Sequence, residues 1–382
     1  QARSVWPATR WAYSSAPLSA MSTDNEEEGS ERQFERVVSS EAPFDDLVEF
    51  DPEPLAEDLY GVGITSFIRD VRKLVIGEGR LCLRLARMTV TLIVLWLTIA
   101  MQVFLLCEFK RVITAGSVHR IRVVYSEYEV WMYNGTTVST VNGFQRGIAG
   151  HFDASRFDSL PEHIGKQQIC SFPLSQPYFS CVLLMVWTFT VIADVRRIQF
   201  HADLLLVRTD TVDSAQEMLE DAQTTLLKGL TMPVKVMMAT LIFLPRLGLD
   251  LILLWLGCRW LLATMDLADV LLNAIALEFI LLLKDLISAA VVPKRNVWET
   301  STLLIPHKRK TYASWESYMG AFLWFVATVA WALLYMFYFQ QVLPDYRWDV
   351  HHVCETFIAE MTSLTAGDDK GSIPPSRRQT HV

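Results

Sequence analysis

The sequence predicts an all-α integral membrane protein with about five transmembrane helices, a small β-rich outer loop domain and disordered tails. Three observations predict this fold class. The chain of 382 residues is 51% hydrophobic and has a positive mean hydropathy, a composition typical of membrane proteins. Residues 88–107 carry no charged side chain and are numerous enough to cross about 30 Å of hydrocarbon. Residues 1–58, by contrast, contain 14 acidic and 4 basic side chains.

The first two segments precede the membrane. Residues 1–58 are rich in Ser, Glu, Asp and Pro and have no apolar periodicity, so we expect a disordered acidic tail. Residues 59–87 interleave apolar residues with arginines and lysine, which predicts an amphipathic helix at a membrane surface. The alternative is a soluble helix that packs beneath the bundle.

The next segments are predicted to cross the membrane twice. Residues 88–107 are the first transmembrane helix and residues 178–195 are the second. Arg196 and Arg197 follow the second helix directly and mark its cytoplasmic end, which places the N-terminus in the cytoplasm. The outer loop domain, residues 108–177, is predicted to be β-rich because apolar and polar residues alternate around 121–133, before the turn signal Asn134-Gly135.

The C-terminal half contains the densest apolar sequence. We expect a broken transmembrane helix at 233–264, because the stretch is too long for one untilted crossing and Pro245 interrupts it. The remaining segments are a cytoplasmic amphipathic segment at 196–231, transmembrane helices at 267–292 and 319–339, a cytoplasmic loop at 293–318, and a polar tail at 340–382.

Ionisable side chains within the spans are candidate functional residues, because burying charge in a membrane is costly. Helical spacing gives the fourth span two polar stripes, with Asp269 and Asn273 on one and Glu278 on the other, and these three residues are the candidate ion pathway. Glu278 paired within the bundle is the alternative.

The same two spans predict a charge cluster. With a turn near residue 265, Arg246 and Lys284 lie at the same depth, roughly 28 Å from the turn, and Asp250 and Asp285 lie within about a helical turn of them. The alternative places these four side chains at the cytoplasmic interface, where they reach water.

The outer side contains candidate modification sites. Asn134-Gly-Thr136 is a glycosylation sequon, although the same residues also suit a hairpin turn. Four cysteines lie at or beyond the outer side, where disulfides form, and either they pair or they stay as buried thiols: Cys107, Cys170, Cys181 and Cys354. The segment from Asp349 to Cys354 has three possible metal ligands but no nearby fourth at a known spacing, and it is predicted to be a surface tail.

Four short segments carry a resemblance: Met132–Thr136, Val141–Arg146, Trp255–Trp260 and Asp269–Phe279. Through them the chain resembles a group of uncharacterised multi-pass membrane proteins of protist algae. The resemblance covers roughly residues 88–355 and implies a shared topology. It implies no activity and assigns no functional residue.

These observations favour an ion channel or transporter-like subunit built around a polar helical hairpin. The alternative is a membrane scaffold or receptor-like protein that binds partners through its outer loop or acidic tail. Catalytic motifs are absent from the sequence, so we expect neither an enzyme nor a cofactor. The expected partners are the lipid bilayer, ions, and other copies or membrane subunits; nucleic acid is excluded because basic clusters are lacking.

Overall fold

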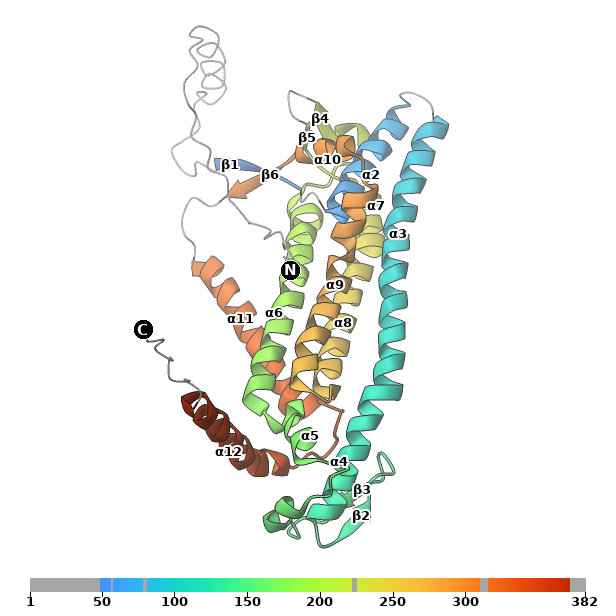
Figure 1. Cartoon of the computed structure of the whole chain (residues 1–382). Helices are drawn as coiled ribbons and strands as arrows, with labels where there is room; N and C mark the ends of the chain where they lie inside the picture. The colour runs from blue at the N-terminus through green and yellow to red at the C-terminus, as the bar shows by residue number, and fades with distance from the viewer. Residues whose placement is uncertain (1–48, 56–57, 78–80, 222–224, 310–314, 372–382) are drawn as a thin grey trace, which may run out of the picture. The chain divides into compact units, whose positions relative to one another are not determined.

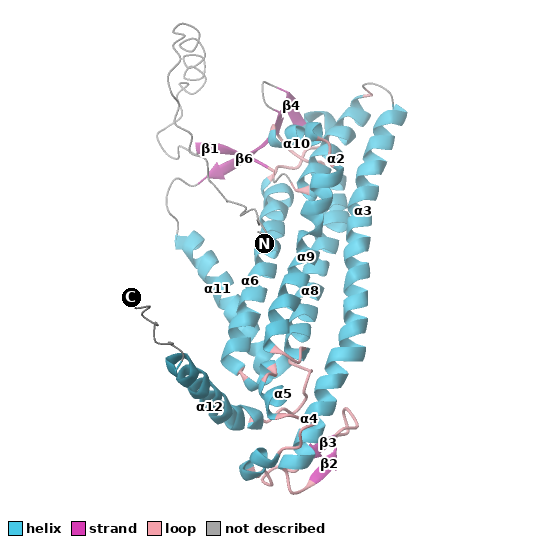
Figure 2. Cartoon of the chain, in the orientation of Figure 1, coloured by secondary structure: helices cyan, strands magenta, loops and turns pink. Residues whose placement is uncertain are grey.

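The computed structural model describes residues 49–55, 58–77, 81–221, 225–309 and 315–371 (Figure 1). Most of these residues are helical, and the strands lie at the two ends of the helix bundle (Figure 2). Four helical stretches are long and apolar enough to cross a membrane: Leu81–Val112, Pro177–Arg208, Met232–Ala263 and Tyr318–Phe339. The predicted class, a multi-pass helical membrane protein, is confirmed at this level.

A further long helix, α9 (Leu267–Val291), packs among these four. It contains four charged residues, Asp269, Glu278, Lys284 and Asp285, and is not among the four stretches. It contacts α8 (Leu244–Ala263), α3 (Leu81–Val112) and α6 (Pro177–Ala202). The helix that follows in the bundle is α11 (Trp315–Leu334), which packs on α6 and continues through a π-helical turn to Phe339.

Beyond the first span, the chain stays helical where the sequence predicted strands. A π-helical turn, Ile113–Ser117, joins α3 to α4 (Val118–Met132). The expectation of β structure around residues 121–133 was therefore wrong. The buried side chains of this stretch are spaced by three or four residues, which is the period of a helix and not of a strand; they are Ile121, Tyr125, Tyr128, Glu129 and Met132.

The end of the bundle that follows α4 carries the small sheet that was predicted, and we call it the hairpin end. Strand β2 (Thr136–Val138) pairs antiparallel with β3 (Gln145–Gly147). The short helix α5 (Lys166–Cys170) also lies here, as does α12 (Asp349–Gly371) (Figure 1). The prediction of a polar tail at 340–382 is corrected here, because part of that segment forms α12. An apolar stripe of this helix packs on the hairpin end, where Val350, Val353 and Cys354 are buried.

The opposite end, which we call the sheet end, carries a four-stranded sheet that the sequence did not predict. Its order is β1-β6-β5-β4. The strands are β1 (Glu49–Pro54), β4 (Leu219–Asp221), β5 (Thr225–Leu227) and β6 (Leu303–Arg309). Strand β1 belongs to the segment predicted as a disordered tail, yet it pairs with β6 from Glu49↔Arg309 to Pro54↔Leu304. The rest of that prediction, residues 1–48, lies outside the described residues.

Helix α2 (Leu59–Ile76) is the helix predicted for residues 59–87, and it ends earlier than expected. The Asp58 side chain accepts a hydrogen bond of 2.7 Å from the Gly61 amide and caps its start. Gly77, with φ of 75°, ends it in the left-handed region that favours glycine. Its first ten residues are all buried, and it packs on α3, α9 and α10 (Lys294–Ser301). A packed helix, the alternative interpretation, therefore describes α2 better than a helix lying on a membrane surface.

The break predicted at Pro245 is also absent. Helix α7 (Met232–Met238) runs through a π-helical turn, Ala239–Phe243, into α8, and the three form one continuous stretch. Proline has no amide hydrogen to donate to the preceding turn. A π-helical turn directly before it widens the helix locally, so the chain continues through the proline. Similarly, a π-helical turn, Asp203–Arg208, extends the helical stretch that begins with α6 into the segment predicted as cytoplasmic.

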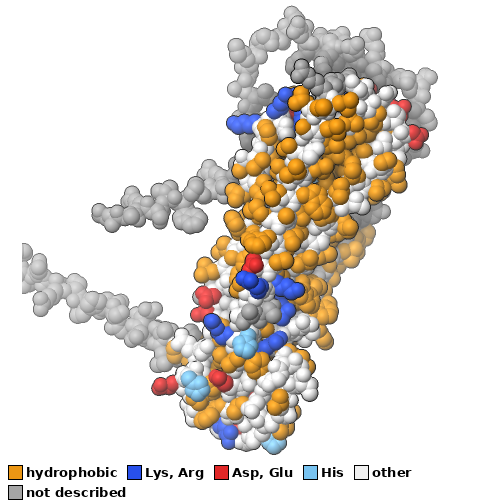
Figure 3. Space-filling view, turned by 90° about the vertical axis from the view of Figure 1, so that its right-hand side faces the viewer, with side chains coloured by type: hydrophobic (Ala, Val, Ile, Leu, Met, Phe, Trp, Pro, Cys, Tyr) orange, Lys and Arg blue, Asp and Glu red, His pale blue; other side chains and the backbone are white. Residues whose placement is uncertain are grey.

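The outward surface of the bundle is apolar. On the face drawn in Figure 3, hydrophobic side chains cover most of the helical part, and many of the charged and histidine side chains gather near the hairpin end. Exposed large side chains of α3 include Ile93, Trp96, Leu97 and Phe104. Apolar side chains that point outward along whole helices are typical of contact with lipid.

Candidate functional site

A cluster of charged side chains is buried between α2, α6, α8 and α9. At its centre is Asp194 of α6, which is 8% exposed. Its Oδ1 accepts a hydrogen bond of 3.1 Å from Arg246 Nη2 and another from Lys284 Nζ. Arg246 and Lys284 are 3% and 4% exposed. One carboxylate therefore joins three helices, and both cations are shielded from water.

Arg246 also connects the cluster to the start of α2. Its Nη1 lies 3.4 Å from Asp58 Oδ2, and its guanidinium carbon lies 4.4 Å from the centre of the Tyr60 ring. Cation–π contacts of this kind are strongest when the cation is shielded from water. The same Asp58 that caps α2 thus also pairs with α8.

Asp250 is the third carboxyl group of the cluster, and it is 5% exposed. It interacts electrostatically with Asp194, Lys284 and Arg246, whereas its Oδ2 has no hydrogen-bond partner among the described residues. Arg197, an exposed residue of α6, also lies 4.0 Å from Asp194 Oδ1 through its Nη1, so three cations face the carboxyl groups of Asp58, Asp194 and Asp250.

A pocket of about 300 Å³ opens beside the cluster at the sheet end. It is lined by Asp58, Asp285 and Ser288, and by residues around the start of α10. Asp285 is partly exposed. The pocket thus meets the cluster at Asp58, which gives the buried carboxyl groups a route toward one side of the bundle.

The predicted charge cluster is therefore present in part and has a different centre. Arg246, Asp250 and Lys284 come together, while Asp285 lies at the rim. From the sequence, Asp194 was interpreted only as the end of a span. It is the sole carboxylate in residues 178–195, and a single carboxylate in an otherwise apolar span could have indicated a buried ion pair. The alternative, in which these side chains lie at the cytoplasmic interface and reach water, does not fit the burial of Arg246 and Lys284.

The three residues of the predicted ion pathway do not come together in this cluster. Asn273 donates a hydrogen bond of 2.8 Å to Thr264 Oγ1 and thereby closes the turn between α8 and α9. Asp269 and Glu278 are exposed. Glu278 is flanked by the exposed apolar residues Ile275 and Phe279, so it points away from the bundle.

The predicted outer sites lie at the hairpin end. Cys170 and Cys354 form a disulfide that ties α5 to α12, while Cys107 is an exposed thiol and Cys181 a buried one. Asn134 is exposed and precedes β2, so it is not the turn of the β2–β3 hairpin.

Asp349 is buried in the same region, contrary to the predicted surface tail. The hydroxyl groups of Tyr125 and Tyr133 each donate a hydrogen bond of 3.0 Å to its carboxylate. Burial raises the pKa of Asp349 although these two hydrogen bonds oppose the rise. Beside it, Arg146 Nε donates a 2.6 Å hydrogen bond to the fully buried Glu129. These pairs fix the start of α12 against α4.

Together, the fold and the cluster define a multi-pass helical membrane protein with an ionic centre buried between its helices. The described residues contain no group of three His, Cys, Asp or Glu side chains arranged to hold a metal ion. The chain matches no protein-family model, and no curated protein or solved structure is significantly similar to it.

Proposed function

We propose that this protein is a transporter-like membrane protein in which the buried cluster exchanges protons or small cations. The observation that carries the proposal is Asp250, a buried carboxyl group whose Oδ2 has no hydrogen-bond partner among the described residues, in a cluster that meets a pocket at Asp58. Ionisable groups buried between the helices of a membrane protein are typical of proton relays and ion-coupling sites.

The arrangement supports exchange more than open conduction. Arg246 and Lys284 hold Asp194 from two helices, so the centre of the cluster is filled by side chains. Binding or losing a proton at Asp250 changes the charge that these cations must balance. Such a change biases the packing of α6, α8 and α9 against one another, which is the kind of movement that alternating access requires.

We also propose five spans, with α9 as the fourth, and the sheet end in the cytoplasm. Arg196 and Arg197 near the sheet end of α6, with Lys294 and Arg295 after α9, support this orientation. Cys82 and Cys107 are exposed thiols near opposite ends of α3. In intact cells, a membrane-impermeant maleimide should fail to label Cys82 in a Cys107→Ser variant until the membrane is permeabilised. Labelling before permeabilisation would reverse the orientation.

The function is tested in proteoliposomes that contain a pH-sensitive dye. With an imposed proton or cation gradient, we expect the protein to move protons, and we expect Asp250→Asn to reduce the initial rate at least tenfold. Asn has nearly the same shape as Asp and cannot exchange a proton, so folding should be preserved. Glu278→Gln is the matched control, because it also replaces a carboxylate on the bundle by an amide, and it should retain the rate.

Comparing the two variants also distinguishes the proposed function from its alternatives. Equal loss in both variants would place the path on the outward face of α9. Absence of flux under every gradient, from folded and inserted protein, would favour the scaffold or receptor-like alternative. In that case the cluster serves only to hold the helices together.

A further inference from the structure

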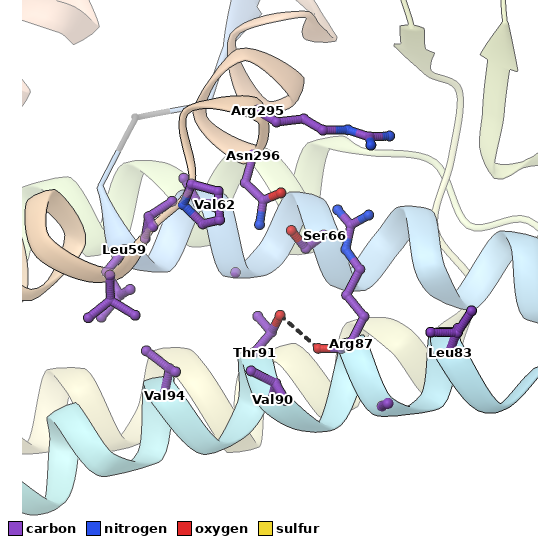
Figure 4. Close-up of a pocket in the computed structure, with 15 residues that line it drawn as sticks. Leu59, Val62, Ser66, Leu83, Arg87, Val90, Thr91, Val94, Arg295 and Asn296 are labelled. Carbon is purple, nitrogen blue, oxygen red and sulfur yellow. Dashed lines mark hydrogen bonds between the residues drawn. The ribbon is translucent and has the colours of Figure 1, made fainter.

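A second pocket, of about 580 Å³, lies between α2, α3 and the junction of α9 and α10 (Figure 4). This volume is within the range of about 300–1,000 Å³ that is common for small-molecule sites. Most of its wall is apolar, formed by Leu59, Val62, Leu83, Val90, Val94, Val291 and Val292. The polar side chains of the wall are Ser66, Arg87, Thr91, Arg295 and Asn296.

The depth of the pocket follows from α3. Arg87 is the last charged residue before the uncharged stretch 88–107, so the boundary of the hydrocarbon layer falls close to it. Val90 and Val94 lie one and two helical turns further into that stretch, and they line the apolar part of the pocket. The pocket therefore extends from the polar interface into the hydrocarbon layer.

The described residues that line the pocket include two cations, Arg87 and Arg295, and no carboxylate. Arg87 Nη2 and Arg295 Nε each lie 2.9 Å from Glu299, and Arg69 Nη1 lies 3.6 Å from it. Asp70 is the other carboxylate, 3.5 Å from Arg87 Nε. The two guanidinium groups of the pocket wall, Arg87 and Arg295, thus share the carboxylate of Glu299.

Arg295 is placed to meet a ligand. Its side chain is 80% exposed and uses one nitrogen for Glu299, which leaves other donors of its fork for an anion. Arg87 reaches from α3 toward α2, as Figure 4 shows. The Thr91 hydroxyl donates its hydrogen bond to the backbone carbonyl of Arg87 and so has no proton left to donate to a ligand. Arg87 and Arg295 are therefore the main donors at the polar end.

We propose that this pocket binds an anionic phospholipid of the surrounding membrane. Its phosphate lies between Arg87 and Arg295, and one acyl chain lies against Val90, Val94 and Leu59. Charge complementarity selects the anionic headgroup, and the apolar wall below it distinguishes a lipid from a free anion. The bound acyl chain would fill the space between α2 and α3. Helix α2 also carries Tyr60, which contacts Arg246 in the ionic cluster, so the lipid would lie against a helix that borders this cluster.

The proposal is tested by native mass spectrometry and thermal unfolding of the purified, full-length protein. Phosphatidic acid and phosphatidylcholine with identical acyl chains are added separately, and inorganic phosphate serves as the headgroup-only probe. We expect phosphatidic acid to be retained at least tenfold better than phosphatidylcholine and to raise the unfolding temperature. Inorganic phosphate should do neither.

Two variants address the two parts of the pocket. Arg295→Ala removes an exposed cation and should reduce the preference for phosphatidic acid several-fold. Val90→Trp fills the apolar part at a position that is 59% exposed in the protein, so folding is preserved while retention of the lipid is lost. Lys228→Ala is the matched control, because it removes an exposed cation from another loop of the sheet end.

Three results would overturn the proposal. Equal retention of the two lipids would exclude charge selection, and an unchanged preference in Arg295→Ala would place the anionic lipid elsewhere. Stabilisation by inorganic phosphate as large as that by phosphatidic acid, unaffected by Val90→Trp, would reduce the site to an anion site without a lipid.

Discussion

Arg246 Nη1 lies 3.4 Å from Asp58 Oδ2, although the two residues are 188 positions apart in the chain. Asp58 is the N-terminal cap of α2, and Arg246 is the first charged residue of α8. This contact joins the segment before the first span to the ionic centre of the bundle. A movement of α2 is therefore coupled to the charges that surround Asp194.

The first prediction concerns this contact. Asp58→Asn removes the charge from Asp58, while the amide oxygen can still cap α2. We expect the free energy of unfolding to fall by about 1–3 kcal/mol, because a buried hydrogen bond to a charged group is weakened. Thermal unfolding in detergent measures the change. Asp269→Asn, at an exposed carboxylate of α9, should leave the unfolding temperature unaltered; an equal fall in both variants would contradict the coupling.

Burial explains which parts of the structure were predictable from sequence. Long uncharged stretches predict the spans directly, because a helix that crosses the hydrocarbon layer must be apolar. The start of β1 carries no such signal, since its pairing with β6 is made by backbone groups of residues more than 200 positions away. The stretch around Tyr125 alternates like a strand over a short window, and only the spacing from Ile121 to Met132 shows that it is a helix.

The candidate site, like the fold, was predictable from sequence only in part. Helical spacing brought Arg246, Asp250 and Lys284 to one level because all three belong to neighbouring helices of a hairpin. It could not find Asp194, because which face of α6 meets that hairpin depends on the packing of three helices. Glu278 was assigned to the interior because a charge in a span is costly, yet the helix turns it outward.

The second prediction therefore concerns Glu278. A carboxylate surrounded by exposed apolar side chains near the middle of α9 opposes contact with lipid. Glu278→Leu should raise the unfolding temperature in lipid nanodiscs, by an amount corresponding to about 1–3 kcal/mol on insertion scales. Leu277→Glu, at a fully buried neighbour, is the opposite control and should destabilise the protein strongly. If Glu278→Leu instead lowered stability, Glu278 would have a partner from another chain.

The third prediction tests the packing of α6 on α8. A Cβ atom at Gly257 would overlap the indole ring of Trp187, which is 3% exposed. Gly257→Ala should destabilise the protein by about 1–3 kcal/mol, as overpacked cores do. Gly248→Ala lies on the same helix and its Cβ would meet no atom within 4 Å. It should be neutral or stabilising, because Ala is the better helix former; equal effects in the two variants would mean that helix propensity, not packing, decides.

The fourth prediction concerns the hairpin end. The Cys170–Cys354 disulfide links residues 184 positions apart, so its loss releases a long loop in the unfolded chain. Cys354→Ser should lower the free energy of unfolding by about 2–4 kcal/mol and loosen α12 from α5. Limited proteolysis after residue 340 should become faster in this variant. Cys107→Ser, at an exposed free thiol, is the control and should behave as the unmodified protein.

The fifth prediction is a pH dependence at the sheet end. Burial alone would raise the pKa of Glu299, but hydrogen bonds from Arg87 and Arg295 lower it below its ordinary value. A carboxyl group with a lowered pKa in the folded state contributes stability above its unfolded pKa of about 4.3. That contribution is lost as the pH falls through the folded pKa.

Unfolding temperatures between pH 3 and pH 7 check this prediction. Glu299→Gln should lower the unfolding temperature at pH 7 and have progressively less effect toward pH 3, because the protonated Glu299 has already lost its pairing with the two arginines. Glu360→Gln, at an exposed position of α12, should change little at either pH. A deficit of Glu299→Gln that stayed constant across this range would mean that shape and hydrogen bonding at residue 299, rather than its charge, hold α10 against α2 and α3.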